Sequence, residues 1–221
     1  MSRIFGLVLS LVFFSISTST WAVVIIDDTT GGLYNSSLGD MADYYGPSHF
    51  PNANSSEGDP NYPSISEPTV FGAAFGTDWL GGDYTGGSWG AVANIPNTWA
   101  VNHESAVVYD FVLGAASDIH IDLGVDNGIY VWLDGTYLFG AMQGGGSNIN
   151  EYNIDLAGVA SGAHSLQILR EDHGGGTGMN ISVDVTDAPV VTVSEPSSFA
   201  LFSLGLIGLM RARKRYASLN R

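Results

Sequence analysis

The sequence predicts an all-β protein with a β-sandwich fold, and three observations carry that prediction. From residue 105 onward, apolar runs of five to eight residues follow one another at short spacing. Glycine-rich turns separate these runs, and no helical apolar period accompanies them. Glycine is abundant, with 29 residues, while charged residues make up only 13% of the chain. That composition argues against a coiled coil and against a charged disordered chain.

The expected strands are runs of β-branched and aromatic residues that end at turn residues. In residues 118–125, isoleucine and leucine alternate with Asp118, His120 and Asp122, which predicts one core face and one solvent face. Asp134-Gly135 predicts a tight hairpin between two strands. The other strands are expected at 23–26, 106–113, 129–133, 137–141, 149–156, 165–169 and 180–186.

A single domain is expected at residues 23–187, a length sufficient to bury a core. The chain has no cysteine, which excludes disulfides and thiolate metal sites. Within the domain, 106–186 carries the regular strands and 29–105 is rich in loops. Three tryptophans recur in the loop-rich part at a spacing of ten residues, but their flanking residues differ too much for a repeat. We expect 29–105 to join the same sandwich, because it lacks a regular apolar pattern for a core of its own.

Charge is distributed very unevenly along the chain. The net charge is −15, and Arg170 is the only Lys or Arg between residues 23 and 194, a stretch that holds 21 acidic residues. Such a surface repels phosphate, so nucleic acid is excluded as a partner and anionic lipid is disfavoured. Divalent cations and neutral sugars remain compatible with it.

The N-terminus has the layout of a secretory signal peptide, which we assign to residues 1–22. Arg3 is followed by a mainly apolar stretch of 13 residues and a short polar stretch that ends at Ala22. Thr20 and Ala22 occupy the positions that signal peptidase reads, so we expect cleavage after Ala22 by the export machinery. The alternative is an uncleaved anchor, although the apolar stretch of this signal helix is short for a full membrane span.

The C-terminus has three parts. Residues 188–198 form a linker, residues 199–210 an apolar run, and residues 211–221 a basic end. Twelve residues give a helix of about 18 Å, which alone would suit a buried core helix. The bases that follow at once indicate instead a short transmembrane helix with a cytoplasmic basic end. These bases are Arg211, Arg213, Lys214 and Arg215.

This tail resembles a PEP-CTERM sorting signal, in which a Glu-Pro motif precedes a short apolar helix and an arginine-rich end. Glu195 and Pro196 match the motif, while Ser194 stands where the family usually has proline. The resemblance implies a Gram-negative bacterium that makes exopolysaccharide, and recognition of the tail by exosortase, a membrane protease. It implies transient anchoring in the inner membrane and final placement on the cell surface or in the extracellular matrix. The alternative is a plain C-terminal membrane anchor.

A second resemblance covers about residues 100–186. The stretch from Asp126-Asn127-Gly128 to Asp134-Gly135 resembles the strand and turn element of galactose-binding-like jelly rolls. The later run from Leu169 to the glycines after His173 resembles the matching loop of PEP-CTERM proteins that carry such a domain. This resemblance implies a jelly-roll sandwich and leaves the ligand open, because such folds host many functions.

Two aromatic side chains are candidates for sugar binding. Tyr130 and Trp132 alternate with aliphatic residues, so both project from one face of the expected strand, about 7 Å apart. An exposed pair at that spacing would stack on a sugar chain. Alternatively, the tryptophan-rich segment 75–100 covers this face and buries both rings.

Asp126 and Asp134 are candidate calcium ligands, since each stands at an expected turn and calcium prefers carboxylate and carbonyl oxygens. Asp27 and Asp28 would add to such a site. The alternative is that these aspartates only form turns, because Asp-Gly is first of all a turn former. The spacing does not match an EF-hand loop.

The polar cluster at 170–173 offers further candidate ligand contacts. Arg170 is expected either to make a fixed ion pair, with Glu171, Asp172 or an acid on a neighbouring strand, or to hold a sugar group. Asp172 and His173 are candidate ligand contacts on the loop that follows. The histidines lack the paired spacing of a catalytic zinc site.

No catalytic motif is present, neither a G-x-S-x-G elbow nor a P-loop. The sequence therefore predicts a protein that is not an enzyme. We expect an exported, non-catalytic module that binds carbohydrate, the exopolysaccharide above all. Two alternatives stay open: a structural or adhesive matrix protein without a small ligand, and a secreted hydrolase.

Overall fold

The computed structural model describes residues 21–46, 50, 61–144, 146–172 and 174–187. No helix among these residues is long and apolar enough to span a membrane. The signal segment up to residue 20, His173 and the whole C-terminal tail from residue 188 lie outside the described residues. The elements are β1 (Val23–Asp27), β2 (Gly32–Gly39), α1 (Met41–Tyr45), β3 (Asn61–Tyr62), the 3₁₀ helix η1 (Ala73–Phe75), β4 (Gly90–Val92), β5 (Glu104–Leu113), β6 (Ser117–Leu133), β7 (Thr136–Gln143), β8 (Tyr152–Val159), β9 (Gly162–Glu171) and β10 (Gly178–Asp187).

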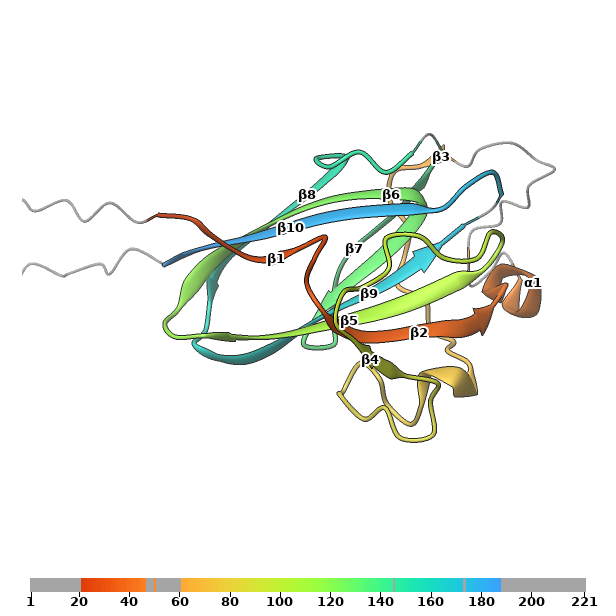
Figure 1. Cartoon of the computed structure of the whole chain (residues 1–221), viewed down its shortest axis with the longest axis horizontal. Coiled ribbons are helices and arrows are strands. Elements are labelled where there is room, and N and C mark those ends of the chain that lie inside the picture. Colours follow the sequence, from red (N-terminus) through yellow and green to blue (C-terminus); the bar gives the residue numbers. More distant parts are fainter. Residues whose placement is uncertain (1–20, 47–49, 51–60, 145, 173, 188–221) are drawn as a thin grey trace, which may run out of the picture. The chain divides into compact units, whose positions relative to one another are not determined.

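The strands form the expected β-sandwich, and the long strand β6 joins its two sheets (Figure 1). The first half of β6 pairs with β10 and β8, and β10 pairs in turn with β1. Its second half pairs with β9 and β7, and the second sheet continues from β9 through β5 and β2 to β4. All of these pairings are antiparallel.

The expected turn at Asp126-Asn127-Gly128 is wrong. These three residues lie inside β6, which runs without interruption where the sequence predicted two strands. Asp126 pairs with Gly178 on one sheet, and Gly128 pairs with Glu171 and Met142 on the other. The polar triplet therefore marks the point where one strand passes between sheets.

The hairpin at Asp134-Gly135 is confirmed. Both residues have positive φ, 51° and 73°, which suits a two-residue turn between β6 and β7. The alternation in β6 is confirmed as well: the side chains of Ile119, Ile121 and Leu123 are buried in the core between the sheets, and the intervening polar residues are more exposed.

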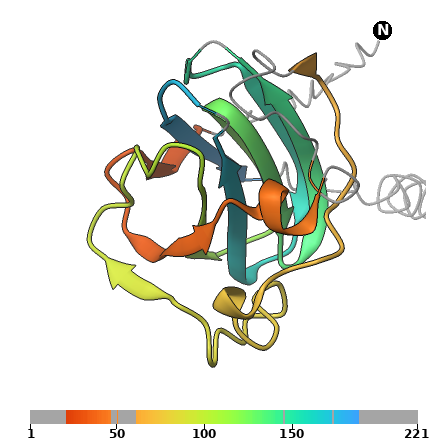
Figure 2. The same cartoon turned by 90° about the vertical axis from the view of Figure 1, so that its right-hand side faces the viewer.

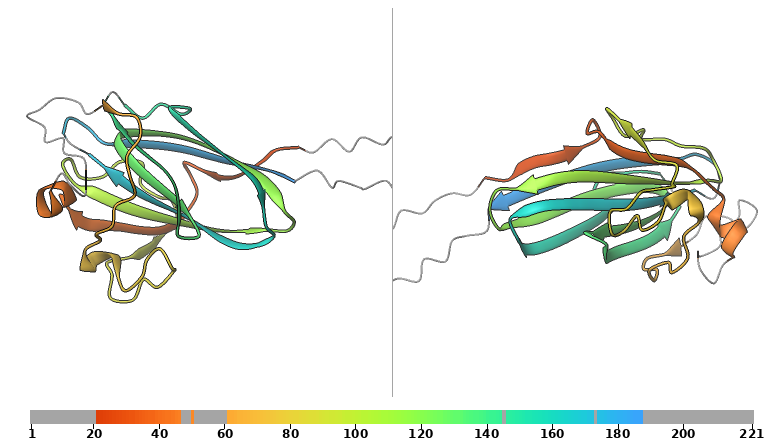
Figure 3. Two further views of the ribbon diagram at one scale, coloured as in Figure 1. Left: turned by 180° about the vertical axis from the view of Figure 1, so that it is seen from behind. Right: turned by 90° about the horizontal axis from the view of Figure 1, so that it is seen from below.

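The opposite face of the second sheet carries a further apolar core. Ala106, Val108, Tyr130, Trp132 and Leu169 project from this face and are fully buried. Residues from the loop-rich part cover them, and the chain between β3 and η1 crosses the sheet there (Figure 3). The covering side chains include Leu38, Met41, Phe50, Ile65, Phe71, Phe75, Trp79 and Trp89. The loop-rich part thus gives β2 and β4 to the second sheet and buries one of its faces.

Candidate functional site

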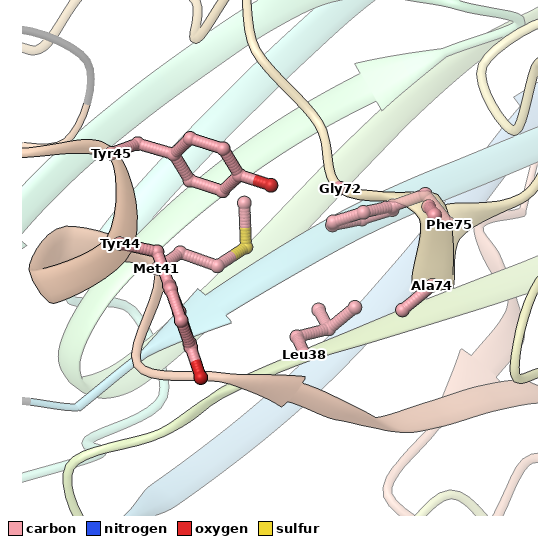
Figure 4. Close-up of a pocket in the computed structure, with 8 residues that line it drawn as sticks. Leu38, Met41, Tyr44, Tyr45, Gly72, Ala74 and Phe75 are labelled. Atoms are coloured by element: carbon pink, nitrogen blue, oxygen red, sulfur yellow. The ribbon is translucent and has the colours of Figure 1, made fainter.

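A pocket between α1 and η1 is the candidate functional site, and both elements lie at the same end of the sandwich (Figure 2). Its volume is about 250 Å³, and none of the side chains that line it is charged. The Tyr44 ring is 77% exposed beside it, whereas Tyr45 is half-buried (Figure 4). The pocket is lined by Leu38, Met41, Tyr44, Tyr45, Gly72, Ala73, Ala74 and Phe75.

Short-range contacts hold α1 in place on its side of the pocket. The Asp40 carboxylate caps the helix by accepting the Asp43 N–H at 2.7 Å. Gly46, with a positive φ of 76°, ends the helix after five residues, and its N–H bonds to the Ala42 carbonyl. Met41 and Ala42 are buried against the sheet, so the tyrosine pair that follows them is directed to the pocket.

The wall across from α1 is fixed by buried polar contacts to η1. The Asn35 side chain, fully buried on β2, donates to the Ala74 carbonyl at 2.7 Å. The Trp89 indole donates to the Phe75 carbonyl at 2.8 Å. A Cβ on Gly72 would lie 2.7 Å from the Tyr45 hydroxyl oxygen, so glycine permits this close approach of the two walls.

Two carboxyl groups lie buried near the pocket without lining it. Glu104 of β5 is 1% exposed and Glu171 of β9 is fully buried. Burial and the neighbouring Glu171 raise the pKa of Glu104 to about 9. Burial, reinforced by the charge of Asp40, holds the pKa of Glu171 well above its usual range. The Glu104 carboxyl accepts the Met41 N–H at 2.6 Å, which connects this pair to α1.

The proposal that Tyr130 and Trp132 form an exposed stacking face is wrong, because both rings are fully buried. The alternative, that the tryptophan-rich segment covers this face, is what the structure shows. Trp79 packs edge-on against Trp132 at 5.3 Å between ring centroids, and the Trp132 indole donates to Glu67 at 2.8 Å. Phe50 packs edge-on against Tyr130 at 6.1 Å.

Arg170 makes neither an ion pair with a described carboxylate nor a contact with solvent, so both expectations for it are wrong. Its guanidinium lies 4.4 Å from the Trp99 ring centroid and donates to Ser105 at 3.0 Å and to the Pro96 carbonyl at 2.7 Å. Burial lowers the pKa of Arg170 to about 10. The residue is therefore part of the core.

Asp172 is buried as well, and it holds backbone groups of two loops. Its side chain is 2% exposed and accepts the N–H groups of Asn102 and Gly174 at 2.6 and 3.1 Å, so it orders two loops. This burial contradicts a direct ligand contact. His173 lies outside the described residues, and its expected role stays a prediction.

The expected calcium site is not assembled among the described residues. Asp126 lies inside β6 and Asp134 in the hairpin turn after it, eight residues later and roughly 25 Å away along an extended chain. Asp134 instead holds the hairpin, accepting the Ser165 N–H at 2.8 Å. Asp27 caps its own turn through Thr29, and Asp28 accepts the N–H of Ile181. No group of three metal-ligating side chains occurs within the described part of the chain.

The outer face of the first sheet holds a histidine between carboxylates. His120 contacts Asp155 at 2.6 Å and Asp122 at 3.0 Å, and Asp184 stands opposite it on β10. The hydrogen bond to Asp155 raises the pKa of His120 above 6.5.

We expect His120 to stabilise the fold in a pH-dependent way. The raised pKa means that the folded state holds this proton more tightly, so the stabilisation is complete below pH 6.5 and disappears as pH rises through the folded-state value. His120→Gln should remove this dependence, an effect within about 1 kcal/mol because the pair is exposed. Urea unfolding between pH 5 and 8 measures it, and equal pH slopes for both proteins would contradict it.

Comparison with known proteins identifies the C-terminal tail. Residues 192–215 match the PEP-CTERM protein-sorting motif. This match supports export and a C-terminal membrane anchor that exosortase processes in a Gram-negative bacterium. A comparison with curated proteins finds no match.

Several solved structures are similar to parts of this chain. A glycoside hydrolase family 2 beta-galacturonidase from Eisenbergiella tayi has 10% identity and a TM-score of 0.41, covering 77% of this chain and 25% of its own. The PA14 sugar-binding domain from an RTX adhesin has 15% identity and a TM-score of 0.34, covering 70% and 89%. The CBM36-1 domain of a xylanase from the hindgut metagenome of Trinervitermes trinervoides has 14% identity and a TM-score of 0.26, covering 43% and 76%.

Proposed function

We propose that this chain is a surface-displayed, non-catalytic module that binds neutral carbohydrate in the pocket between α1 and η1. The observation that carries the proposal is Tyr44, which is 77% exposed and lines a pocket of about 250 Å³. Aromatic rings contact the apolar face of a sugar ring, and a tyrosine hydroxyl adds a hydrogen bond. The volume suits one or two sugar units.

The charge of the domain favours a neutral ligand. Arg170 is the only Lys or Arg among the described residues, and it is fully buried. The domain therefore offers no described Lys or Arg to the carboxylate of a uronic acid, and its many acidic residues repel one. We expect polygalacturonate to bind at least about tenfold more weakly than a neutral polysaccharide at low salt, a difference that added salt should reduce.

The composition of the pocket supports binding without catalysis. A glycosidase places two carboxyl groups across an open site, on either side of the bond that it cleaves. None of the eight residues that line the pocket carries a carboxyl group. The neighbouring acids, Glu104 and Glu171, are buried, and burial raises the pKa of both.

The pocket and the end of β10 lie at opposite ends of the sandwich. β5 begins at Glu104 beneath α1 and ends at Leu113, close to the start of β6 at Ser117. Ser117 pairs with Asp187, the last described residue before the tail. A strand of ten residues spans about 33 Å. The end of β10 therefore lies far from α1 (Figure 1).

Tyr44→Ala should weaken binding of a soluble neutral glucan or galactan about tenfold, the equivalent of 1.4 kcal/mol for one lost stacking contact. The full chain is titrated by calorimetry with each polysaccharide. Tyr62→Ala is the matched control, because this tyrosine is 44% exposed on β3 and does not line the pocket. Equal losses in both variants would contradict the proposal. Absence of binding to any neutral polysaccharide would favour the structural-matrix alternative, and released sugar products would favour a hydrolase.

A further inference from the structure

The two buried glutamates are directly opposed in the second sheet. Ser105 pairs with Arg170, so the next pair in this antiparallel register is Glu104 with Glu171. Side chains of such a pair project from the same face, about 5 Å apart at their Cβ atoms. Gly39 pairs with Glu104 on one side, and Gly128 pairs with Glu171 on the other.

Because Gly128 has no side chain, the Glu171 carboxyl group has space beside it. A Cβ there would lie 3.0 Å from the Glu171 carboxylate oxygen Oε2. On each side of the glutamate pair, the next strand therefore presents a glycine, Gly39 or Gly128. Glu104 also contacts α1 through the Met41 N–H.

Other titratable groups lie close to this pair. Asp40 at the start of α1 raises the pKa of both glutamates, and the Tyr130 hydroxyl on β6 lies beside Glu171. Arg170 is next to Glu171 in sequence, but it projects from the opposite face of β9. Burial and the neighbouring acids raise the pKa of both glutamates, so the folded pair favours the protonated form at neutral pH.

This pair is connected to the pocket through α1. Glu104 accepts the N–H of Met41, the first helical residue, and Met41 itself lines the pocket. A helix of five residues has no stability of its own, so its position depends on the contacts that seat it. Tyr44 and Tyr45 follow on the same helix, and their position therefore depends on the same contacts.

We propose that the Glu104–Glu171 pair is a proton-dependent latch that seats α1 on the sheet and thereby forms the pocket. While the pair is protonated, Glu104 accepts the Met41 N–H and α1 stays in place. Ionisation places opposed negative charges beneath α1, which separates the helix from the sheet and opens the pocket. The latch itself is independent of any ligand; its coupling to carbohydrate binding rests on the proposed function.

The sign of the pH dependence follows from proton release. A solvated glutamate titrates near pH 4.5, whereas burial and the neighbouring Glu171 raise the pKa of the seated Glu104 to about 9. Between these two pH values, the release of α1 from the sheet therefore also releases a proton. For each proton released, the equilibrium constant for opening increases tenfold for every unit by which the pH rises. The latch weakens as pH rises through this range.

Hydrogen exchange of the full chain tests the latch without a ligand. The protection factor of the α1 amides, corrected for intrinsic exchange rates, should fall at least about tenfold per unit between pH 6 and 8. The double variant Glu104→Gln/Glu171→Gln should show no pH dependence, because glutamine accepts the same hydrogen bond and has no proton to lose. The single variant Glu171→Gln should show a smaller pH dependence of the α1 protection factor than the wild type. It provides the test if the double variant does not fold well.

Glu151→Gln is the matched control, since Glu151 also has a raised pKa and bonds to Val125 on the other sheet. It should behave as the wild type does. A flat wild-type profile, or equal slopes in the wild type and the double variant, would overturn the latch. Binding of the neutral polysaccharide is then measured at pH 6 and 8. A pH-dependent latch without any polysaccharide binding would refute the proposed function and leave the latch standing.

Discussion

Trp132→Ala should cost about 3–5 kcal/mol of the free energy of unfolding, the range for an aromatic ring deleted from a packed core. The ring is fully buried and packs against Phe71, Trp79 and Tyr137 at centroid distances of 5.3 to 6.1 Å. Its deletion leaves a cavity beneath the covering segment and breaks the hydrogen bond to Glu67. A loss of this size is a large part of the stability of a typical domain.

Urea unfolding of matched variants measures the effect of Trp132. Trp132→Phe keeps most of the ring packing and loses only the indole donor, so it should cost about 1–2 kcal/mol. Val112→Ala, on a residue that is 75% exposed on β5, should stay within about 0.5 kcal/mol of the wild type. A Trp132→Ala protein as stable as Val112→Ala would show that the covering segment does not pack on this face.

Arg170→Ala is expected to have the second largest effect, a loss of about 2–4 kcal/mol. The substitution removes two hydrogen bonds, to Ser105 and to the Pro96 carbonyl, and the contact of the guanidinium with Trp99. Hydrogen bonds from charged groups contribute about 1.5–3 kcal/mol and a desolvated cation–π contact about 2 kcal/mol, but burial of the charge offsets part of this gain.

The companion variant Arg170→Met separates packing from charge. Methionine keeps an aliphatic stem and avoids the cost of burying a charge, so it should lose less stability than alanine does. Arg170→Lys should lose the planar contact with Trp99 and the bond from Nε to Ser105. The same denaturation assay applies, and an alanine variant within 0.5 kcal/mol of the wild type would show that Arg170 does not stabilise the loop around Trp99.

Much of the fold was predictable because most strands carry the two-residue alternation or a β-branched run. Ile119, Ile121 and Leu123 face the core as predicted, and the Asp134-Gly135 hairpin follows from turn chemistry. The continuity of β6 was not predictable, because Asp126-Asn127-Gly128 has the composition of a turn. Whether such a triplet reverses the chain or continues a strand depends on partners on two different sheets.

The burial of Tyr130 and Trp132 could not be decided from their spacing. Alternation shows that two side chains share a face of a strand, but it says nothing of what covers that face. The cover comes from an irregular segment whose side chains, such as Phe71 and Trp79, follow no period. Its high aromatic content was the one available signal, and it favoured the covered alternative.

The pocket and the latch were missed for different reasons. A five-residue helix is too short for a helical period, and the available signal was an Asp40 cap before the tyrosine pair. Glu104 and Glu171 meet through the register of two strands far apart in the sequence, which a single sequence does not specify. Arg170 appeared to be a natural partner for acids, but it projects from the opposite face.

Hydrogen-exchange footprinting with a soluble neutral polysaccharide tests the central claim most directly. The full chain is compared at pH 6 with and without a saturating concentration of the polysaccharide found by calorimetry. The proposed site predicts slowed exchange in the segments of α1 and η1, and no change in β8 and β10 on the outer face of the first sheet. Protection on that outer face with none at α1 and η1 would contradict the pocket as the binding site.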